Sequence, residues 1–311
     1  MAIFGSFWDD FKYAIRTGNM VTRLITINFA VFILVNVTYL VTWVVLGLDK
    51  DLMVGVYTKG LNWFCMPGDW RTLLWQPWSM VTSIFLHEEI RHFLFNIMGL
   101  YLFGNIVSDL IGDRKVLPIY LLGGLAGNII YLISAQFLPY IGSHALGASG
   151  AIMALGGAAL IIAPEYRVAL LMLGEIKLKY IVFVMLLLDM VGIADQTNTG
   201  GHAAHLGGFI MGCIIIYQLH EGKDWSIPIN NAFDKLMRWF SREKRRQPAP
   251  KKKKQPAFRT TMGGAQGHAV SDHIDLTFQE RLDAILDKIK QNGYENLTQE
   301  EKDFLFNASK K

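Results

Sequence analysis

The sequence is short of cysteine and of charged residues. It has two cysteines, Cys65 in an expected loop and Cys213 in an expected membrane span, so we expect neither a disulfide framework nor a redox site. Only 18% of the residues are charged, whereas 52% are hydrophobic. The first long apolar run lacks a small-residue cleavage site and is too long for the core of a signal peptide, so no cleavable signal is expected. No nucleic-acid partner is expected either.

The hydrophobic residues fall in blocks long enough to cross a bilayer, which takes about 20 residues. Six such blocks predict an all-α, polytopic membrane protein with six transmembrane helices. The blocks cover residues 24–46, 92–109, 116–137, 148–163, 180–194 and 202–219. The fourth and fifth are short for spans that face lipid. Glycines and alanines in the fourth indicate a helix inside the bundle.

Basic residues predict the orientation in the membrane. They gather before the first block, in alternate connections and after the sixth block, whereas the other connections hold fewer. Before the first block and in the second-to-third and fourth-to-fifth connections, these basic residues are Lys12, Arg16, Arg23, Arg114, Lys115, Arg167, Lys177 and Lys179. The positive-inside rule therefore predicts that both termini lie in the cytoplasm. In that topology the outer ends of blocks two, four and six lie at one depth.

Four polar residues fall at these outer ends. Ser149 and His205 are a candidate nucleophile and base, since a serine hydroxyl needs a base to become reactive. His92 and Asn96 are four residues apart, so they share a helix face and offer N–H donors for an oxyanion hole. A structural interpretation stays open for each: Ser149 permits close helix packing, and the other three pair with backbone groups.

Glycines around these residues predict close helix contacts. Gly147 and Gly150 flank Ser149 at the expected start of a helix, where unpaired N–H groups and the helix dipole favour a developing negative charge. Gly208 and Gly212 form a small-xxx-small face on the sixth block. That face is expected to bring His205 close to Ser149. The polar stretch 196–201 before it is a candidate cap over the site or an ordinary turn.

The motifs His92-xxx-Asn96, Gly147-Ala148-Ser149-Gly150 and Ala204-His205-Leu206-Gly207-Gly208-xxx-Gly212 resemble those of the rhomboid intramembrane serine proteases. The resemblance implies Ser149 as nucleophile and His205 as base, with no acid completing a triad. It implies His92, Asn96 and the Ser149 N–H as oxyanion donors, with Gly147 beside them. It also implies transmembrane protein substrates, no metal or organic cofactor, and a multi-pass protein of the bacterial inner membrane.

Three positions depart from the family pattern, although Gln76-Pro77-Trp78 resembles its first-loop segment. Ser79 stands where arginine is frequent, and Ser108 where glutamate is frequent. Met153 replaces the aromatic residue that stacks on the base. A thioether still packs against an imidazole ring. These changes affect loop anchoring and helix packing more than the chemistry.

Other functions are weighed against a serine protease. His87-Glu88-Glu89-Ile90-Arg91-His92 resembles a zinc-binding H-E-x-x-H motif, but its histidines are five residues apart and do not share a helix face. A catalytically inactive adaptor that binds transmembrane helices uses the same scaffold, although such relatives usually lose the serine or histidine. Asp189, an acid within the fifth block, is expected to hydrogen bond between helices, and a proton-relay role in a transporter stays open.

The sequence predicts four regions. Residues 1–20 hold an amphipathic interfacial helix, and residues 21–219 the catalytic core. Residues 220–273 form a basic juxtamembrane segment and linker, in which 235–254 are expected to attract anionic lipid or only to anchor the topology. Residues 274–311 form a small helical tail that needs an unknown partner. Its two helices are expected to start at the capping boxes Thr277-Phe278-Gln279-Glu280 and Thr298-Gln299-Glu300-Glu301.

Overall fold

The structure is a computed structural model in which the chain forms two units, Met1–Arg245 and Arg246–Lys311. The described residues are 18–46, 50–138, 141–170, 174–196, 198–240, 282–283, 285–289 and 297–308. The expected interfacial helix in residues 3–15, the basic run 241–254, the linker 255–273 and the first capping box at 277–280 lie outside them.

Each of the six hydrophobic blocks is a helix, which confirms the all-α, polytopic fold class. The helices are α2 (Met20–Leu46), α6 (Ile90–Ile111), α7 (Val116–Phe137), α8 (Ser149–Ile162), α9 (Leu178–Ala194) and α10 (Thr199–His220). Among the described residues, four helices are long and apolar enough to cross a membrane, namely Met20–Leu46, Ile90–Ile111, Asp113–Phe137 and Thr199–His220. Helices α8 and α9 are shorter, so the count of six spans stays a prediction.

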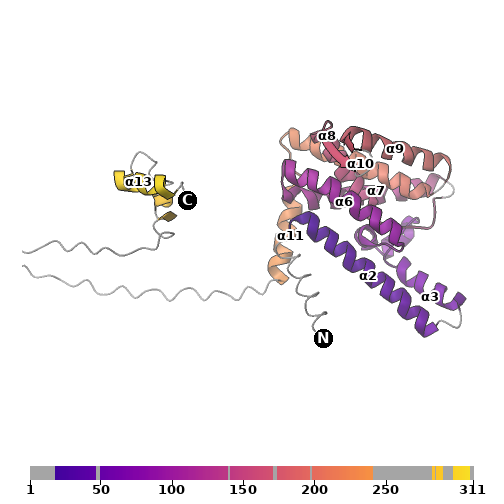
Figure 1. Ribbon diagram of the computed structural model, residues 1–311. Helices are drawn as coiled ribbons and strands as arrows, with labels where there is room; N and C mark the ends of the chain where they lie inside the picture. The colour runs from indigo at the N-terminus through magenta and orange to yellow at the C-terminus, as the bar shows by residue number, and fades with distance from the viewer. Residues whose placement is uncertain are drawn as a thin grey trace, which may run out of the picture. The chain divides into compact units, whose positions relative to one another are not determined.

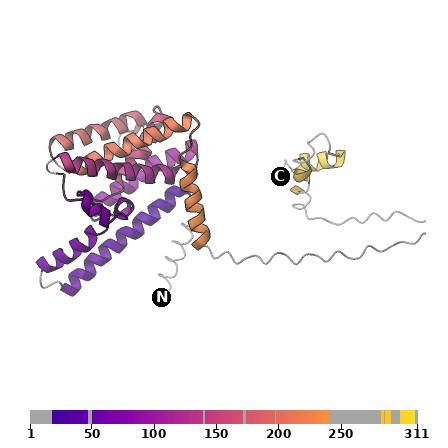
Figure 2. The same ribbon diagram turned by 180° about the vertical axis from the view of Figure 1, so that it is seen from behind.

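Helices α7, α8 and α10 pack most closely, with α6 and α9 beside α8 (Figure 1). Ten of the 14 residues of α8 are buried, and most of those ten are glycine or alanine. Helix α2 lies along α6 and then leaves the bundle together with α3 (Lys50–Asn62), as both views show (Figure 2). The short α8 is therefore the interior helix that its small residues predicted.

Small residues let these central helices approach backbone to backbone. A β-carbon on Gly212 of α10 would come within 2.0 Å of the Ala154 carbonyl oxygen in α8. A β-carbon on Gly123 of α7 would come within 2.1 Å of the Ala154 β-carbon. Larger side chains at these positions would force the helices apart, which sets where α10 crosses α8.

The connection between α2 and α6 is folded rather than irregular. It contains α3, β1 (Met66–Pro67), α4 (Trp70–Trp75), α5 (Ser79–Thr82) and the 3₁₀ helix η1 (Ser83–Phe85). Strand β1 pairs antiparallel with β2 (His144–Ala145), which directly precedes the serine motif. Asn128 of α7 donates hydrogen bonds to the Met80 carbonyl, at 2.8 Å, and to Ser83 Oγ, at 2.9 Å. The connection is thus fixed to the bundle next to the candidate site.

Two further elements were not expected from the sequence. A hairpin of β3 (Arg167–Leu170) and β4 (Gly174–Lys177) joins α8 to α9. Helix α11 (Ser226–Phe240) lies within the region taken as a basic juxtamembrane segment, because polar and apolar residues there alternate at helical spacing.

Helix α11 is attached to the connection between α6 and α7, which contains the 3₁₀ helix η2 (Asp113–Lys115). Arg114 pairs with Asp234 at 2.6 Å. Lys115 pairs with Asp224 and donates to Ser226 Oγ at 2.9 Å. The folded core therefore extends past the end of the sixth block.

The second unit contains α13 (Gln299–Ala308). The Thr298 N–H donates to the Glu301 carboxylate at 2.8 Å, and the Glu301 N–H donates to Thr298 Oγ1 at 3.3 Å. This reciprocal pair confirms the capping box predicted there. Lys288 of the preceding helical segment pairs with Glu301 at 2.8 Å.

Candidate active site

One cavity of about 940 Å³ collects the candidate catalytic residues. Its lining comes from α6, α7, α8, α9 and α10, and from the segments before α6, α8 and α10. The polar part of the lining includes His92, Asn96, Ser149 and His205. Residues from three separate blocks thus meet at one place, as the common depth of the blocks predicted.

Ser149 is the first residue of α8. The first N–H groups of a helix have no partner within it and carry the positive end of the helix dipole. An oxyanion formed on a group attached to Ser149 would lie close to these donors. The position is therefore suited to a nucleophile whose reaction develops negative charge.

Gly147 lies between the serine and the α6 histidine. Its φ of +129° is in a region that favours glycine. A β-carbon there would come within 2.8 Å of His92 Cε1 and 3.7 Å of Ser149 Oγ. The Gly147 N–H donates to the Ser83 carbonyl at 2.9 Å, which fixes this turn. The missing side chain leaves room where His92 and Ser149 approach each other.

Asn96 is oriented by a residue to which sequence analysis gave no role in this site. Asn96 Nδ2 lies 3.1 Å from Nε2 of His87, a fully buried residue in the loop before α6. The Ala148 N–H also points at His87 Nε2, at 3.5 Å. Burial, and after it the neighbouring His92, lowers the pKa of His87 to about 4. A neutral His87 accepts from one N–H of Asn96 and leaves the other for the cavity.

No local pattern could have identified His87 as this partner. It is nine residues before Asn96 and on a different element, so helical periodicity does not relate them. In the sequence analysis, His87 was named only as part of the segment that resembles the zinc-binding H-E-x-x-H motif. In the structure the ring centroids of His87 and His92 are 5.3 Å apart.

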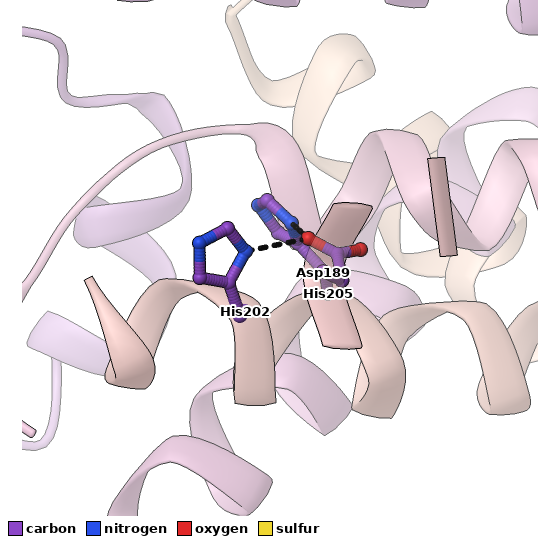
Figure 3. Close-up of side chains that lie close together, drawn as sticks. All are labelled: Asp189, His202 and His205. Carbon is purple, nitrogen blue, oxygen red and sulfur yellow. Dashed lines mark hydrogen bonds and ion pairs between the residues drawn. The ribbon is translucent and has the colours of Figure 1, made fainter. Parts of the chain in front are cut away.

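The base candidate His205 has an acidic partner. His205 Nδ1 lies 2.6 Å from Asp189 Oδ1, and His202 Nδ1 lies 2.7 Å from the same oxygen. Figure 3 shows the two imidazoles of α10 converging on the Asp189 carboxylate of α9. The expected interhelical hydrogen bond of Asp189 is confirmed. The sequence analysis had not singled out His202.

The same three residues form a candidate metal site, because their ligand atoms lie within 4.8 Å of one another. Zinc sits about 2.0–2.2 Å from each nitrogen or oxygen ligand in a tetrahedral site, so neighbouring ligand atoms are more than 3 Å apart. Here both nitrogens are within 2.7 Å of one oxygen. The three side chains fit direct hydrogen bonding as they stand and would have to separate to hold an ion.

The positions that depart from the family pattern have ordinary packing roles. Met153 is buried and lines the cavity. Ser79 is fully buried in α5. Ser108 donates to Asp113 at 3.4 Å, next to the turn into η2. The polar stretch 196–201 was the candidate cap over the site. Two of its residues, Asn198 and Gly201, line the cavity.

Comparison with known proteins agrees with this geometry. Residues 74–222 match the Rhomboid domain, and residues 277–311 match a family of unknown function, DUF6576. The chain is 25% identical over 158 residues to RHOMBOID-like protein 12, mitochondrial, of Arabidopsis thaliana, covering 47% of each chain. It is 30% identical over 144 residues to Presenilin-associated rhomboid-like protein A, mitochondrial, of Danio rerio, covering 46% of this chain and 37% of the relative.

A third relative is the Rhomboid protease GluP of Bacillus subtilis, 34% identical over 136 residues, or 43% of this chain and 24% of the relative. The chain thus spans between 24% and 47% of the length of these relatives. The protein is a polytopic membrane protein that contains a rhomboid domain. It is homologous to rhomboid-family proteins from bacteria and mitochondria.

Proposed function

We propose that the protein is an intramembrane serine endopeptidase that cleaves transmembrane or membrane-proximal segments of other membrane proteins. The observation that carries the proposal is the cavity that Ser149, His205, His92 and Asn96 line together. A relative named Rhomboid protease GluP supports the same activity. An inactive adaptor would have no need to keep a serine and a histidine in one cavity.

The proposed chemistry uses these four side chains, the Ser149 backbone N–H and water. His205 takes the proton of the Ser149 hydroxyl while the Ser149 oxygen bonds to the substrate carbonyl carbon. His92, Asn96 and the Ser149 N–H donate to the oxyanion. His205 then protonates the leaving amine, and an acyl ester forms on Ser149. A water molecule gives His205 a proton, attacks the ester and releases the acid, while Ser149 regains its hydroxyl.

The walls of the cavity favour an apolar polypeptide as substrate. Phe95, Met98 and Leu102 line it from α6, and Met185 and Leu188 line it from α9. Apolar side chains on the two helices that pack against α8 suit a segment that arrives from lipid, and the polar groups then act on its backbone. Hydrophobic pocket walls with few polar groups are typical of specific binding sites.

Covalent labelling tests the proposal. The full chain in neutral detergent is treated with a serine-directed fluorophosphonate, and cleavage of a reporter transmembrane protein is measured in parallel. The wild type and the control Ser134→Ala, which changes a serine outside the cavity lining, are expected to label and cleave. Ser149→Ala is expected to do neither, and a chelator is expected to have no effect. A wild type that binds the reporter without labelling or cleavage would identify an adaptor instead.

The location within the cell is also a proposal. The hydrophobic blocks support six spans, the basic residues support cytoplasmic termini, and the resemblance supports a bacterial inner membrane. The relatives include two mitochondrial proteins, so they do not favour a bacterial membrane over a mitochondrial one. Anionic lipid is the proposed partner of the basic residues 235–254.

A further inference from the structure

The Asp189 carboxylate lies behind the candidate base, outside the substrate cavity. Asp189 is 5% exposed and is not part of the cavity lining, whereas His205 is. Asp189 belongs to α9, and its Oδ1 lies 2.6 Å from Nδ1 of His205 on α10. An ionised carboxylate can accept hydrogen bonds but cannot donate them. Nδ1 of His205 therefore carries the proton in this contact. Nε2 is then the nitrogen with a free lone pair.

The environment of this carboxylate is built to hold it in place. His202 donates to the same oxygen from the preceding turn of α10, at 2.7 Å. Its ring lies against Gly192 of α9, where a β-carbon would come within 2.1 Å of His202 Nε2. Any other residue at position 192 would push the His202 ring away. One acid therefore receives two donors in a fixed geometry, which offsets part of the cost of burying its charge.

We propose that Asp189 is a positioning residue that extends the Ser149–His205 pair to a serine–histidine–aspartate triad, with His202 holding the carboxylate. The inference rests on the proposed protease function. Asp189 fixes the tautomer and orientation of His205 and stabilises the imidazolium that forms when His205 takes the serine proton, the role of the acid in other serine hydrolases. The resemblance implied no acid, so this protein departs from the expected dyad.

Kinetics of Asp189→Asn in the full chain test the proposal. An amide removes the charge and permits the wrong tautomer, so kcat for a reporter transmembrane substrate is expected to fall at least about tenfold with KM unchanged. Asp195→Asn is the matched control, because Asp195 is an exposed acid that follows the same helix and does not line the cavity. His202→Phe keeps a ring beside Gly192 and is expected to lower kcat less than Asp189→Asn does, since the His205 contact remains.

Histidine ¹⁵N NMR of the wild type gives a second readout, which reports the tautomer itself rather than a rate. In the wild type the neutral His205 side chain is expected as the Nδ1–H tautomer, with its resonances assigned by their loss in His205→Ala. Finding the Nε2–H tautomer would overturn the inference. So would a folded Asp189→Asn with wild-type kcat, or an equal loss in Asp189→Asn and His202→Phe.

Two outcomes distinguish a failure of the proposed triad from a failure of the proposed protease function. A wild-type protein that neither labels with fluorophosphonate nor cleaves would refute the protease function, while the tautomer measurement still tests the Asp189–His205 pair. Loss of wild-type activity on chelation, with recovery on added Zn²⁺, would show that activity requires a metal ion and would overturn the triad.

Discussion

Gly208 of α10 lies so close to Gly150 of α8 that a β-carbon on Gly208 would come within 1.9 Å of the Gly150 carbonyl oxygen. Gly150 directly follows Ser149, and Gly208 is three residues after His205. The contact therefore sets the distance between the two helices at the candidate site. A helix crossing this close needs glycine on at least one side.

Gly208→Val is accordingly expected to separate α8 from α10 and to lower the thermal midpoint in detergent by far more than a surface change. The matched control is Gly55→Val in α3, where a β-carbon meets nothing within 4 Å. Differential scanning fluorimetry compares the two. Equal midpoints for both variants would show that α8 and α10 adjust to the added side chain.

Ser149→Ala and His205→Ala are each expected to abolish cleavage of a reporter transmembrane protein. The double variant is expected to lose little more than either single variant, because the two side chains act as one unit. Cleavage rates of the three variants in the same detergent provide the measurement. Additive losses would indicate that the two residues contribute separately.

Asn96→Ala is expected to lower kcat by about 10²-fold, as loss of one oxyanion donor does, with little change in thermal midpoint. Asn105→Ala is the control on the same helix, since Asn105 donates to the Tyr101 carbonyl of its own helix and lies outside the cavity lining. If Asn96→Ala instead unfolds the protein while its folded fraction stays fully active, Asn96 is a structural residue.

The pKa of His87 predicts a loss of stability in acid. The folded-state pKa of about 4 is below the ordinary value of 6.5, so the unfolded chain binds the proton first as the pH falls. The contribution of neutral His87 is complete above pH 6.5 and declines between pH 6.5 and 4. A difference of this size in pKa corresponds to about 3 kcal/mol.

Thermal midpoints measured between pH 7 and 4 check this expectation. His87→Gln keeps a neutral acceptor for Asn96 and removes the titrating group, so its midpoint is expected to fall less steeply than that of the wild type. Parallel curves for the two proteins would mean that other groups, such as the carboxyl of Glu88, govern the acid response.

The position of α11 predicts how far the chain can be shortened. Truncation after residue 245 removes the second unit and is expected to leave cleavage in neutral detergent unchanged. Truncation after residue 222 also removes the contacts of Arg114 with Asp234 and of Lys115 with Asp224, so we expect a lower thermal midpoint. In vesicles with anionic lipid, any effect of the truncation after residue 245 on the cleavage rate is expected to disappear with added salt, because salt screens the attraction between basic residues and lipid. Loss of activity after the first truncation would show that the tail acts on the core.

The sequence alone predicted the six long apolar helices and the residues of the candidate site. Block length predicted the helices, because a segment that crosses lipid must pair its own backbone groups. Polar residues are expensive at membrane depth, so Ser149 and His205 stood out against apolar neighbours. The spacing of His92 and Asn96 placed both on one face of α6, since a helix repeats every 3.6 residues.

Tertiary structure decided which side chains meet across elements. Asp189 was recognisable as an interhelical partner, but its pairing with His205 depends on where α9 crosses α10. The contact of His87 with Asn96 depends on the path of a loop. Helical periodicity relates residues within one element only, whereas the crossing points follow from backbone contacts such as Gly208 with Gly150 and Gly212 with Ala154. The orientation of His205, the candidate base, is therefore a property of packing, although the residue itself was recognisable in the sequence.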